Sequence, residues 1–306
     1  MESFNPLPIK NIGDPFILKA QGRYYLYATS APDGFMVWQS KDLISWSEPE
    51  YCYRKSERSF GRDCFWAPEV YFLNDQYYMY YTAQCKTSQE EDLQIGVAVS
   101  ATPEGPFVDV YDKEPLSHFG YGVLDGHVFC DDDNQLYLYY SRAGQNNFVD
   151  GYREADIYVV RLNGDGITVE GEPVLLIQTS QEWERASKMN QFWNEGPFVV
   201  KHDGKYHMMY SANFFASKYY GVGGAVSESP MGPYEKYPHN PILSFVEGKI
   251  SGPGHNSVVE ALDGKTLYCV YHAHTDYNKP SENRQVYIDP LVFENGYIKI
   301  LGPTKR

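Results

Sequence analysis

Residues 194–211, NEGPFVVKHDGKYHMMYS, contain the pattern on which the fold prediction rests. A carboxylate, Glu195, precedes a short apolar run, and a polar turn at 202–205 separates that run from a Tyr-containing run at 206–210. β-Branched and aromatic residues on both sides of a Gly-containing turn are typical of a β-hairpin. The stretch therefore predicts two antiparallel strands with a carboxylate at the start of the first.

The same pattern recurs along the whole chain. The polar residues that open the repeats are Asp14, Glu69, Asp125, Glu195 and His255, and the steps between them are 55, 56, 70 and 60 residues. A second landmark, a serine at 40, 100 and 227, follows three of these residues after 26, 31 and 32 positions. Self-similarity at this period predicts an all-β fold, a five-bladed β-propeller formed by residues 1–306 as a single domain.

Composition agrees with an all-β core. The chain contains 28 Tyr, 16 Phe and 5 Trp, residues that favour strands, and amphipathic helical runs are hard to find. A β-sandwich is the alternative, but a sandwich does not need a polar residue in register at the head of every repeat. The five cysteines show no CxxC spacing, so we expect buried free thiols.

Charge and hydropathy exclude some classes of partner. The net charge of −14 argues against nucleic acid, whose binding needs a basic surface. No apolar run reaches membrane length and no signal peptide is apparent, so we expect a cytoplasmic protein without a membrane partner.

The repeated polar residues point to a site. In a propeller the first strands of all blades line the central channel in the same direction, so equivalent residues meet at one mouth. Carboxylates that face one another repel, burial raises their pKa values, and pockets that hold such groups are functional candidates. Two carboxylates across an apolar-walled pocket suit glycoside hydrolysis, in which one protonates the leaving oxygen and the other activates water.

Two further stretches bear on sugar binding. Trp66 stands just before the second inner strand, where an aromatic face can hold the apolar face of a sugar ring. The extra residues 178–192 predict a short helix or a loop over the rim, a place where insertions shape the binding face of repeat proteins.

Five segments together resemble glycoside hydrolase family 43. They are DPF at 14–16, WAPE at 66–69, LDGHVF at 124–129, NEGPF at 194–198 and GPGHNS at 252–257, and they span almost the whole chain. The resemblance implies a five-bladed propeller enzyme that acts mainly on α-L-arabinofuranosides and β-D-xylosides with inversion of configuration. Inversion requires carboxyl groups roughly 6.5–9.5 Å apart, with room for a water.

The resemblance also implies roles for the three carboxylates. Asp14 matches the general base, Glu195 the general acid, and Asp125 the carboxylate that orients the sugar and raises the pKa of the acid. The chain departs from the family pattern in having Glu69 where Asp is common and Asp125-Gly126-His127 where Asp-Pro is common.

Substrate contacts and an ion site follow from the same resemblance. The expected substrate-binding residues are Trp66, Glu69, His127 and Arg284. His255 matches a histidine near the channel centre that, in many members, helps to bind calcium or another ion through water, and a structural histidine is the alternative. The chemistry itself is expected to need no cofactor.

The function expected from these features is that of an exo-acting α-L-arabinofuranosidase on small arabinose- or xylose-containing oligosaccharides. A β-D-xylosidase is the alternative, although many family xylosidases carry an added C-terminal β-sandwich. Two other classes stay open, a non-catalytic sugar-binding propeller and a phosphorylase. The phosphorylase needs a phosphate-binding cluster, for which Arg284, His272 and His274 are the candidates.

Overall fold

The computed structural model describes residues 5–85 and 92–305, which form an all-β fold. Strand pairing divides the chain into consecutive antiparallel sets of four. The first set is β1 (Gly13–Ala20), β2 (Arg23–Ala31), β3 (Gly34–Ser40) and β4 (Glu50–Arg54). The second is β5 (Asp63–Leu73), β6 (Gln76–Gln84), β7 (Leu93–Ser100) and β8 (Val108–Asp109).

The later part of the chain repeats this arrangement. The third set is β9 (Val123–Cys130), β10 (Leu136–Arg142), β12 (Tyr152–Leu162) and β13 (Val169–Ile177). The fourth is β14 (Gln191–His202), β15 (Lys205–Ala212), β16 (Gly221–Ser227) and β17 (Glu235–Lys236). The fifth is β18 (Gly254–Glu260), β19 (Leu267–His274), β20 (Arg284–Glu294) and β21 (Tyr297–Ile300). The short strand β11 (Phe148–Val149) adds to β12 as a hairpin.

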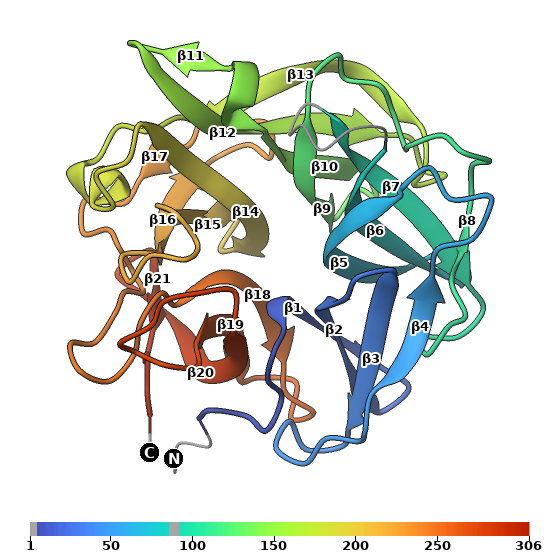
Figure 1. Cartoon of the computed structure of the whole chain (residues 1–306), viewed down its shortest axis with the longest axis horizontal. Helices are drawn as coiled ribbons and strands as arrows, with labels where there is room; N and C mark the ends of the chain where they lie inside the picture. The colour runs from blue at the N-terminus through green and yellow to red at the C-terminus, as the bar shows by residue number, and fades with distance from the viewer. Residues whose placement is uncertain (1–4, 86–91, 306) are drawn as a thin grey trace.

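The sets lie side by side around a common centre, with β1, β5, β9, β14 and β18 innermost (Figure 1). A parallel pairing of 153–155 in β12 with 191–193 in β14 joins the third and fourth sets into one nine-stranded sheet. The prediction of an all-β fold is confirmed, and each residue predicted to open a repeat lies on an innermost strand.

Local sequence explains the hairpins. Within residues 5–85 and 92–305, five two-residue turns have both central residues at positive φ, and they lie at 21–22, 74–75, 150–151, 203–204 and 295–296. This backbone matches the right-handed twist of paired strands and favours Gly, Asn and Asp, which four of the five turns place at both positions. The predicted turn at Asp203-Gly204 is one of them.

The serine landmark has a structural cause. Ser40, Ser100 and Ser227 each end the third strand of a set. Each hydroxyl accepts a hydrogen bond from the backbone N–H two residues later, at 3.1–3.2 Å. Such local side-chain to backbone bonds compete with the strand ladder and terminate it.

Tyrosines fill the space between adjacent sets. Tyr27, Tyr80 and Tyr139 lie on second strands and are fully buried. Their hydroxyls donate to the backbone carbonyls of Pro103, Gly166 and Pro230, at 2.5–2.7 Å. A buried phenol needs such a partner, so these bonds fix the outer loops to the core.

The two ends of the chain are held together. Leu7 donates its backbone N–H to the carbonyl of Val286 at 2.9 Å, and Val286 donates to Ile9 at 3.1 Å. The Asn5 side chain donates to the Ile288 carbonyl at 2.9 Å. The N-terminal segment is thereby attached to β20 of the last set, beside the C-terminus (Figure 1).

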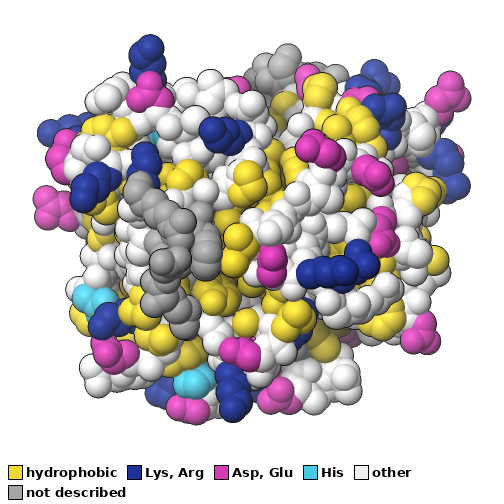
Figure 2. All heavy atoms as spheres, turned by 90° about the horizontal axis from the view of Figure 1, so that it is seen from below, with side chains coloured by type: hydrophobic (Ala, Val, Ile, Leu, Met, Phe, Trp, Pro, Cys, Tyr) yellow, Lys and Arg dark blue, Asp and Glu magenta, His cyan; other side chains and the backbone are white. Residues whose placement is uncertain are grey.

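The surface mixes charge types. On the face shown in Figure 2, acidic and basic side chains are interspersed among hydrophobic ones, so the acidic excess of the sequence forms no single patch on this face. Within residues 5–85 and 92–305, no helix has the length and apolar character needed to span a membrane. Cys52 and Cys269 are buried free thiols, whereas the Cys130 thiol is exposed.

Candidate active site

Each innermost strand carries, in its first half, a residue at positive φ where the backbone bulges. These residues are Asp14 (56°), Ala67 (45°), Asp125 (56°), Gly196 (56°) and His255 (48°). At each of these points the register with the second strand shifts. A bulge of this kind re-aims a side chain, and strained backbone of this kind clusters at functional sites.

These bulges correct the alignment of the repeats. The structurally equivalent positions are 14, 67, 125, 196 and 255, whereas the sequence analysis aligned Glu69 and Glu195 with Asp14. That alignment was wrong by two residues and by one, because bulges insert residues that an apolar pattern does not show. Glu195 remains next to its bulge, but Glu69 lies further along its strand.

Hydrogen bonds between neighbouring sets fix the bulges. The backbone N–H of a bulge residue donates to a side chain on the second strand of the preceding set. The pairs are Ala67 with Thr29 Oγ1 (2.9 Å), Asp125 with Thr82 Oγ1 (2.9 Å), His255 with Ser211 Oγ (2.7 Å) and Asp14 with His272 Nδ1 (3.1 Å). The last pair connects the final set to the first.

In the fourth set the N–H of the bulge residue has a different acceptor, the side chain of the predicted catalytic residue Asp125. The N–H of Gly196 donates to Asp125 Oδ2 at 3.1 Å, and Ser141 Oγ, the equivalent of Thr29, has no hydrogen-bond partner in the described part of the chain. Asp125 is thereby tied to the residue that follows Glu195.

Asp14 is held as a carboxylate. Thr29 donates to its Oδ2 at 2.6 Å, and Arg284 Nη1 donates to its Oδ1 at 3.2 Å. Burial alone raises the pKa of Asp14, but Arg284, His255 and the Thr29 hydrogen bond outweigh burial and hold that pKa far below its ordinary value. Asp14 is therefore ionised at neutral pH, as a general base must be.

His272 supports Asp14 as a neutral ring. Burial, together with the nearby Arg284, lowers the pKa of His272 well below its ordinary value. Its Nδ1 can then accept the Asp14 backbone N–H. Because His272 is uncharged, the charge that stabilises the Asp14 carboxylate comes first from Arg284 and then from His255.

Asp125 has the opposite electrostatic character. Burial raises its pKa to about 7, and the charges of Glu195 and Asp14 add to this effect against an opposing contribution from His255. The charges of Glu195 and Asp14 therefore act on the Asp125 carboxyl group. The three residues come from β14, β1 and β9.

Glu195 is oriented by a residue that the sequence analysis missed. Tyr220, which immediately precedes β16, donates its hydroxyl to Glu195 Oε1 at 2.7 Å. Its ring is buried and stacks on His272 at 5.7 Å, and burial followed by the charge of Glu195 raises the pKa of Tyr220 well above its ordinary value. No repeat position signals Tyr220, because it comes from a loop without a counterpart in the pattern.

The insertion predicted at 178–192 also reaches this site. It contains the short 3-10 helix η3 (Glu182–Arg185). The Asn194 side chain, next to Glu195, hydrogen-bonds the Thr179 hydroxyl at 2.9 Å. The insertion therefore supports the strand start from which Glu195 projects.

A cavity of about 350 Å³ opens beside Asp14. Trp66 and Arg284 line it together with Gly13 and Thr29. Two of the four predicted substrate-binding residues, Trp66 and Arg284, therefore share a cavity with direct neighbours of the predicted base. Such a concave site with an aromatic wall and a few polar groups suits a small sugar.

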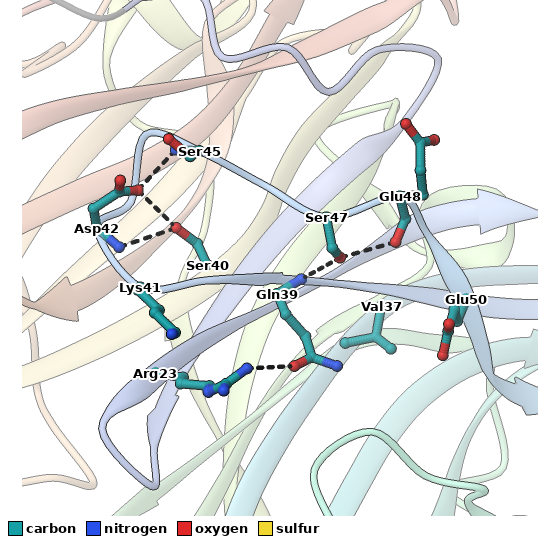
Figure 3. A pocket seen from close by; sticks show the side chains of 10 residues that line it. All are labelled: Arg23, Val37, Gln39, Ser40, Lys41, Asp42, Ser45, Ser47, Glu48 and Glu50. Carbon is teal, nitrogen blue, oxygen red and sulfur yellow. Dashed lines mark hydrogen bonds between the residues drawn. The ribbon is translucent and has the colours of Figure 1, made fainter.

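A second cavity, of about 500 Å³, lies on the outer part of the first set (Figure 3). Its wall includes Arg23, Gln39, Asp42 and Glu50, and none of the predicted site residues. Several of its polar groups bind one another, as Arg23 does with Gln39 at 3.5 Å. The cavity that contains Trp66 is the better candidate, because Thr29 and Arg284 in its wall both donate hydrogen bonds to Asp14.

A family model described as glycosyl hydrolases family 43 matches residues 4–298. The chain belongs to glycosyl hydrolase family 43. It is 28% identical over 300 residues to the beta-D-galactofuranosidase xynD of Aspergillus niger, a match that covers 92% of this chain and 79% of that protein. It is 25% identical over 283 residues to an extracellular exo-alpha-(1->5)-L-arabinofuranosidase of Streptomyces avermitilis, over 88% of this chain and 55% of that protein.

Solved structures agree with the family assignment. One described as a thermostable family-43 glycoside hydrolase is 45% identical, with a TM-score of 0.94 and coverage of 100% of this chain and 97% of that chain. Another, described as an endo-1,4-beta-xylanase from Bacteroides thetaiotaomicron, is 32% identical with a TM-score of 0.80 and 96% coverage of both. The chain spans about half the length of several curated relatives. It is a family 43 glycosidase, and the non-catalytic alternative is set aside.

The two departures from the family 43 pattern form a pair. Glu69 Oε2 and His127 Nδ1 lie 2.9 Å apart, and Tyr71 contacts both groups. His127 Nε2 accepts the backbone N–H of Val199 at 3.0 Å, so both ring nitrogens have protein partners. Both side chains are buried. This placement favours a structural link between β5, β9 and β14 over the predicted contact with substrate.

The predicted ion site has few donors. His255 Nδ1 faces Asp14 Oδ1 at 3.3 Å, and the same oxygen already binds Arg284. Within residues 5–85 and 92–305, no group of three or more His, Cys, Asp or Glu side chains is placed to hold a metal ion. The residues therefore do not fit a directly coordinated ion, and calcium held through water near His255 stays a prediction.

Gly13 is needed for the Asp14–Arg284 contact. A Cβ at this position would stand 2.1 Å from Arg284 Nη2 and displace the guanidinium. We expect Gly13→Ala to lower kcat/KM by about 10–100-fold, the cost of a lost charge-assisted hydrogen bond. Because the pKa of Asp14 rises without Arg284, the acidic limb of the pH–kcat/KM profile moves to higher pH. Gly164→Ala is the control, since a Cβ there meets nothing. An unchanged acidic limb would contradict the role of Arg284.

Asp125 makes stability depend on pH. Its pKa in the folded state is about 7 against an ordinary value of 3.8, so its contribution is complete below about pH 4 and is lost as pH rises towards 7. Asp125→Asn removes the buried charge and can still accept from Gly196. We expect the variant to be more stable than wild type above pH 7 by up to about 4 kcal/mol, with the difference shrinking towards pH 4. Denaturant unfolding at several pH values measures this; a constant difference would disprove it.

Proposed function

We propose that this family 43 glycosidase removes terminal pentosyl groups with inversion, as an exo-acting α-L-arabinofuranosidase on small arabinose-containing oligosaccharides. The observation that carries the proposal is the opposite electrostatic state of two neighbouring carboxyl groups. Arg284 and Thr29 keep Asp14 ionised, whereas Asp125, beside Glu195, resists ionisation. An ionised carboxylate can act as the general base, and a buried carboxyl group that keeps its proton can orient a sugar hydroxyl beside Glu195, the proposed acid.

In the proposed mechanism a water molecule gives a proton to Asp14 while its oxygen attacks the anomeric carbon. Glu195 gives its proton to the glycosidic oxygen, which departs with the remaining sugar. Tyr220 holds Glu195 in position. Asp125, with its second oxygen free of the Gly196 bond, orients a sugar hydroxyl, and Trp66 lies against the ring.

The proposed architecture is a five-bladed propeller in a single domain. The five sets would be its blades, and the hydrogen bonds of the bulge residues, including the His272–Asp14 bond between the last set and the first, support this arrangement. The substrate then enters at the mouth where the bulges meet.

β-D-Xylosidase activity is the second candidate, because the relatives include both kinds of enzyme. A relative from Butyrivibrio fibrisolvens is described as a xylosidase/arabinosidase and is 24% identical over 96% of this chain. Phosphorolysis receives less support, since Arg284 and His272 are engaged with Asp14 and His274 is held by Ser251 and the Phe215 carbonyl.

Hydrolysis of p-nitrophenyl α-L-arabinofuranoside, β-D-xyloside and β-D-galactofuranoside by the purified protein tests the proposal. We expect the arabinofuranoside to have the highest kcat/KM. A higher value for the xyloside would favour the second candidate, and no hydrolysis of any of the three would contradict both.

A further inference from the structure

Four aromatic side chains form a partly exposed strip that starts at the candidate site. The aromatic strip consists of Phe215, Phe214, Trp193 and Phe148. The first three are half-buried, and Phe148, on the β11 hairpin, is 64% exposed. Large exposed aromatic surface that is not covered by the fold marks a binding surface.

Contacts connect the members of the strip to the catalytic groups. Arg284, which binds Asp14, lies over the Phe215 ring at 5.2 Å. The Phe215 and Phe214 rings are 4.9 Å apart, and Phe214 and Trp193 are 5.3 Å apart. The inner end of the strip is therefore part of the candidate site.

The pairing register of β14, β12 and β11 places Phe148 on the same face of the sheet as Trp193. Trp193 and Glu195 lie two residues apart on β14 and so project from the same face. On this face Gln191 is opposite Arg153 in the parallel pairing, and Arg153 is opposite Phe148 in the β11–β12 hairpin. The Arg153 guanidinium lies 6.0 Å from the Phe148 ring centre. Phe148 thus stands on the face that presents Glu195, at the outer edge of the fold (Figure 1).

The burial pattern agrees with this direction. Phe192, which points to the opposite face of β14, is 6% exposed and packs against Tyr152 at 4.9 Å. Its neighbour Trp193 is left half-exposed. The chain therefore buries one aromatic residue of this pair and leaves the other open beside Glu195.

We propose that the aromatic strip binds the leaving-group side of a pentose oligosaccharide. The inference rests on the proposed function, because it uses Glu195 as the group that protonates the leaving oxygen. The part of the substrate that departs lies on the side of the acid, and the strip extends from Glu195 along β14 to the β11 hairpin. Aromatic faces pack on sugar rings, and the exposed Arg153 supplies hydrogen-bond donors for sugar hydroxyls.

The strip sets the preferred substrate length. A p-nitrophenyl pentoside carries one small leaving group and does not reach Phe148, whereas a longer oligosaccharide does. Binding energy from these remote units raises kcat/KM for long substrates relative to short ones. The enzyme should therefore prefer chains over disaccharides.

Phe148→Ala and Trp193→Ala test the proposal, with Phe72→Ala as the matched control. Phe72 is 55% exposed and lies near the far end of β5 from Trp66. Each protein is assayed on the p-nitrophenyl pentoside and on linear α-1,5-arabino- and β-1,4-xylo-oligosaccharides from the disaccharide upward. We expect the ratio of kcat/KM for the longest oligosaccharide to that for the p-nitrophenyl pentoside to fall about tenfold in Phe148→Ala, the typical effect of removing a binding aromatic. Phe72→Ala should keep the wild-type ratio. An unchanged ratio in both strip variants overturns the proposal.

Binding measured without turnover separates this inference from the proposed function. Calorimetric titration of Glu195→Gln with the same oligosaccharides should show affinity that rises with length, and the added Phe148→Ala should abolish the rise. Failure of the wild type to hydrolyse any glycoside, together with this length dependence, would contradict the proposed function and leave the strip supported. Affinity that is independent of length, or unaffected by Phe148→Ala, overturns the strip whatever the catalytic result.

Discussion

Asp14→Asn is expected to lower kcat by about 10²–10⁴-fold on every hydrolysed pentoside, the range for loss of a general base. The amide cannot take a proton from water, although it is close in shape to the carboxylate that Thr29 and Arg284 hold. The leaving group does not change this requirement. Steady-state kinetics on the p-nitrophenyl pentoside and on an oligosaccharide should therefore show similar losses.

A matched aspartate distinguishes catalysis from folding. Asp263 is exposed and accepts backbone hydrogen bonds from Lys265 and Thr266 in a turn, where Asn is tolerated. Asp263→Asn should retain wild-type kcat. If Asp14→Asn is folded, as judged by its thermal unfolding, and keeps more than half of the wild-type kcat, Asp14 is not the base.

Glu195→Gln is expected to lower kcat much more on an oligosaccharide than on the p-nitrophenyl pentoside. On an oligosaccharide, whose departing oxygen needs protonation, kcat should fall by about 10²–10⁴-fold. On the p-nitrophenyl pentoside the loss should be far smaller, because p-nitrophenolate departs without a proton. The comparison of the two substrates in one variant assigns the acid more directly than either rate alone.

The control for Glu195 is Glu228→Gln. Glu228 is exposed and forms a surface ion pair with Lys205 at 2.7 Å, an interaction of small expected effect. This variant should match wild type on both substrates. Equal losses of Glu195→Gln on the two substrates would show that Glu195 acts in some way other than proton donation.

Local sequence patterns predicted much of the fold. Hairpins with Asn, Asp and Gly turns, serine-terminated third strands and Tyr-rich second strands are local features, so a single sequence displays them. The same patterns placed Asp14, Asp125 and Glu195 at the starts of inner strands, and the structure brings these three together.

The β-bulges are the reason why the repeats were misaligned in the sequence prediction. Ala67 and Gly196 are the structural equivalents of Asp14 and Asp125, but neither has a polar side chain. An alignment of the repeats by their polar residues therefore selects the nearby Glu69 and Glu195 instead. A bulge adds a residue without altering the alternation of apolar residues nearby. Glu69 and His127 were therefore assigned to the substrate, whereas the structure pairs them with each other.

Contacts between segments that are distant in the chain could not be predicted from the sequence. Tyr220 reaches Glu195 from outside the repeats, and Gly13 matters because Arg284, far along the chain, fills the space above it. The aromatic strip likewise needs the parallel pairing of β12 with β14, which no repeat predicts. Each of these depends on how segments distant in sequence lie in space.

The most direct test of the account is the anomeric configuration of the first product, followed by proton NMR before mutarotation. With p-nitrophenyl α-L-arabinofuranoside, a base at Asp14 that directs water to the face opposite the leaving group should give β-L-arabinofuranose first. If the xyloside is the substrate, α-D-xylose should appear first. Initial release of the anomer with the substrate's own configuration would mean retention through a covalent intermediate, and would contradict the assignment of Asp14 as the base that activates water.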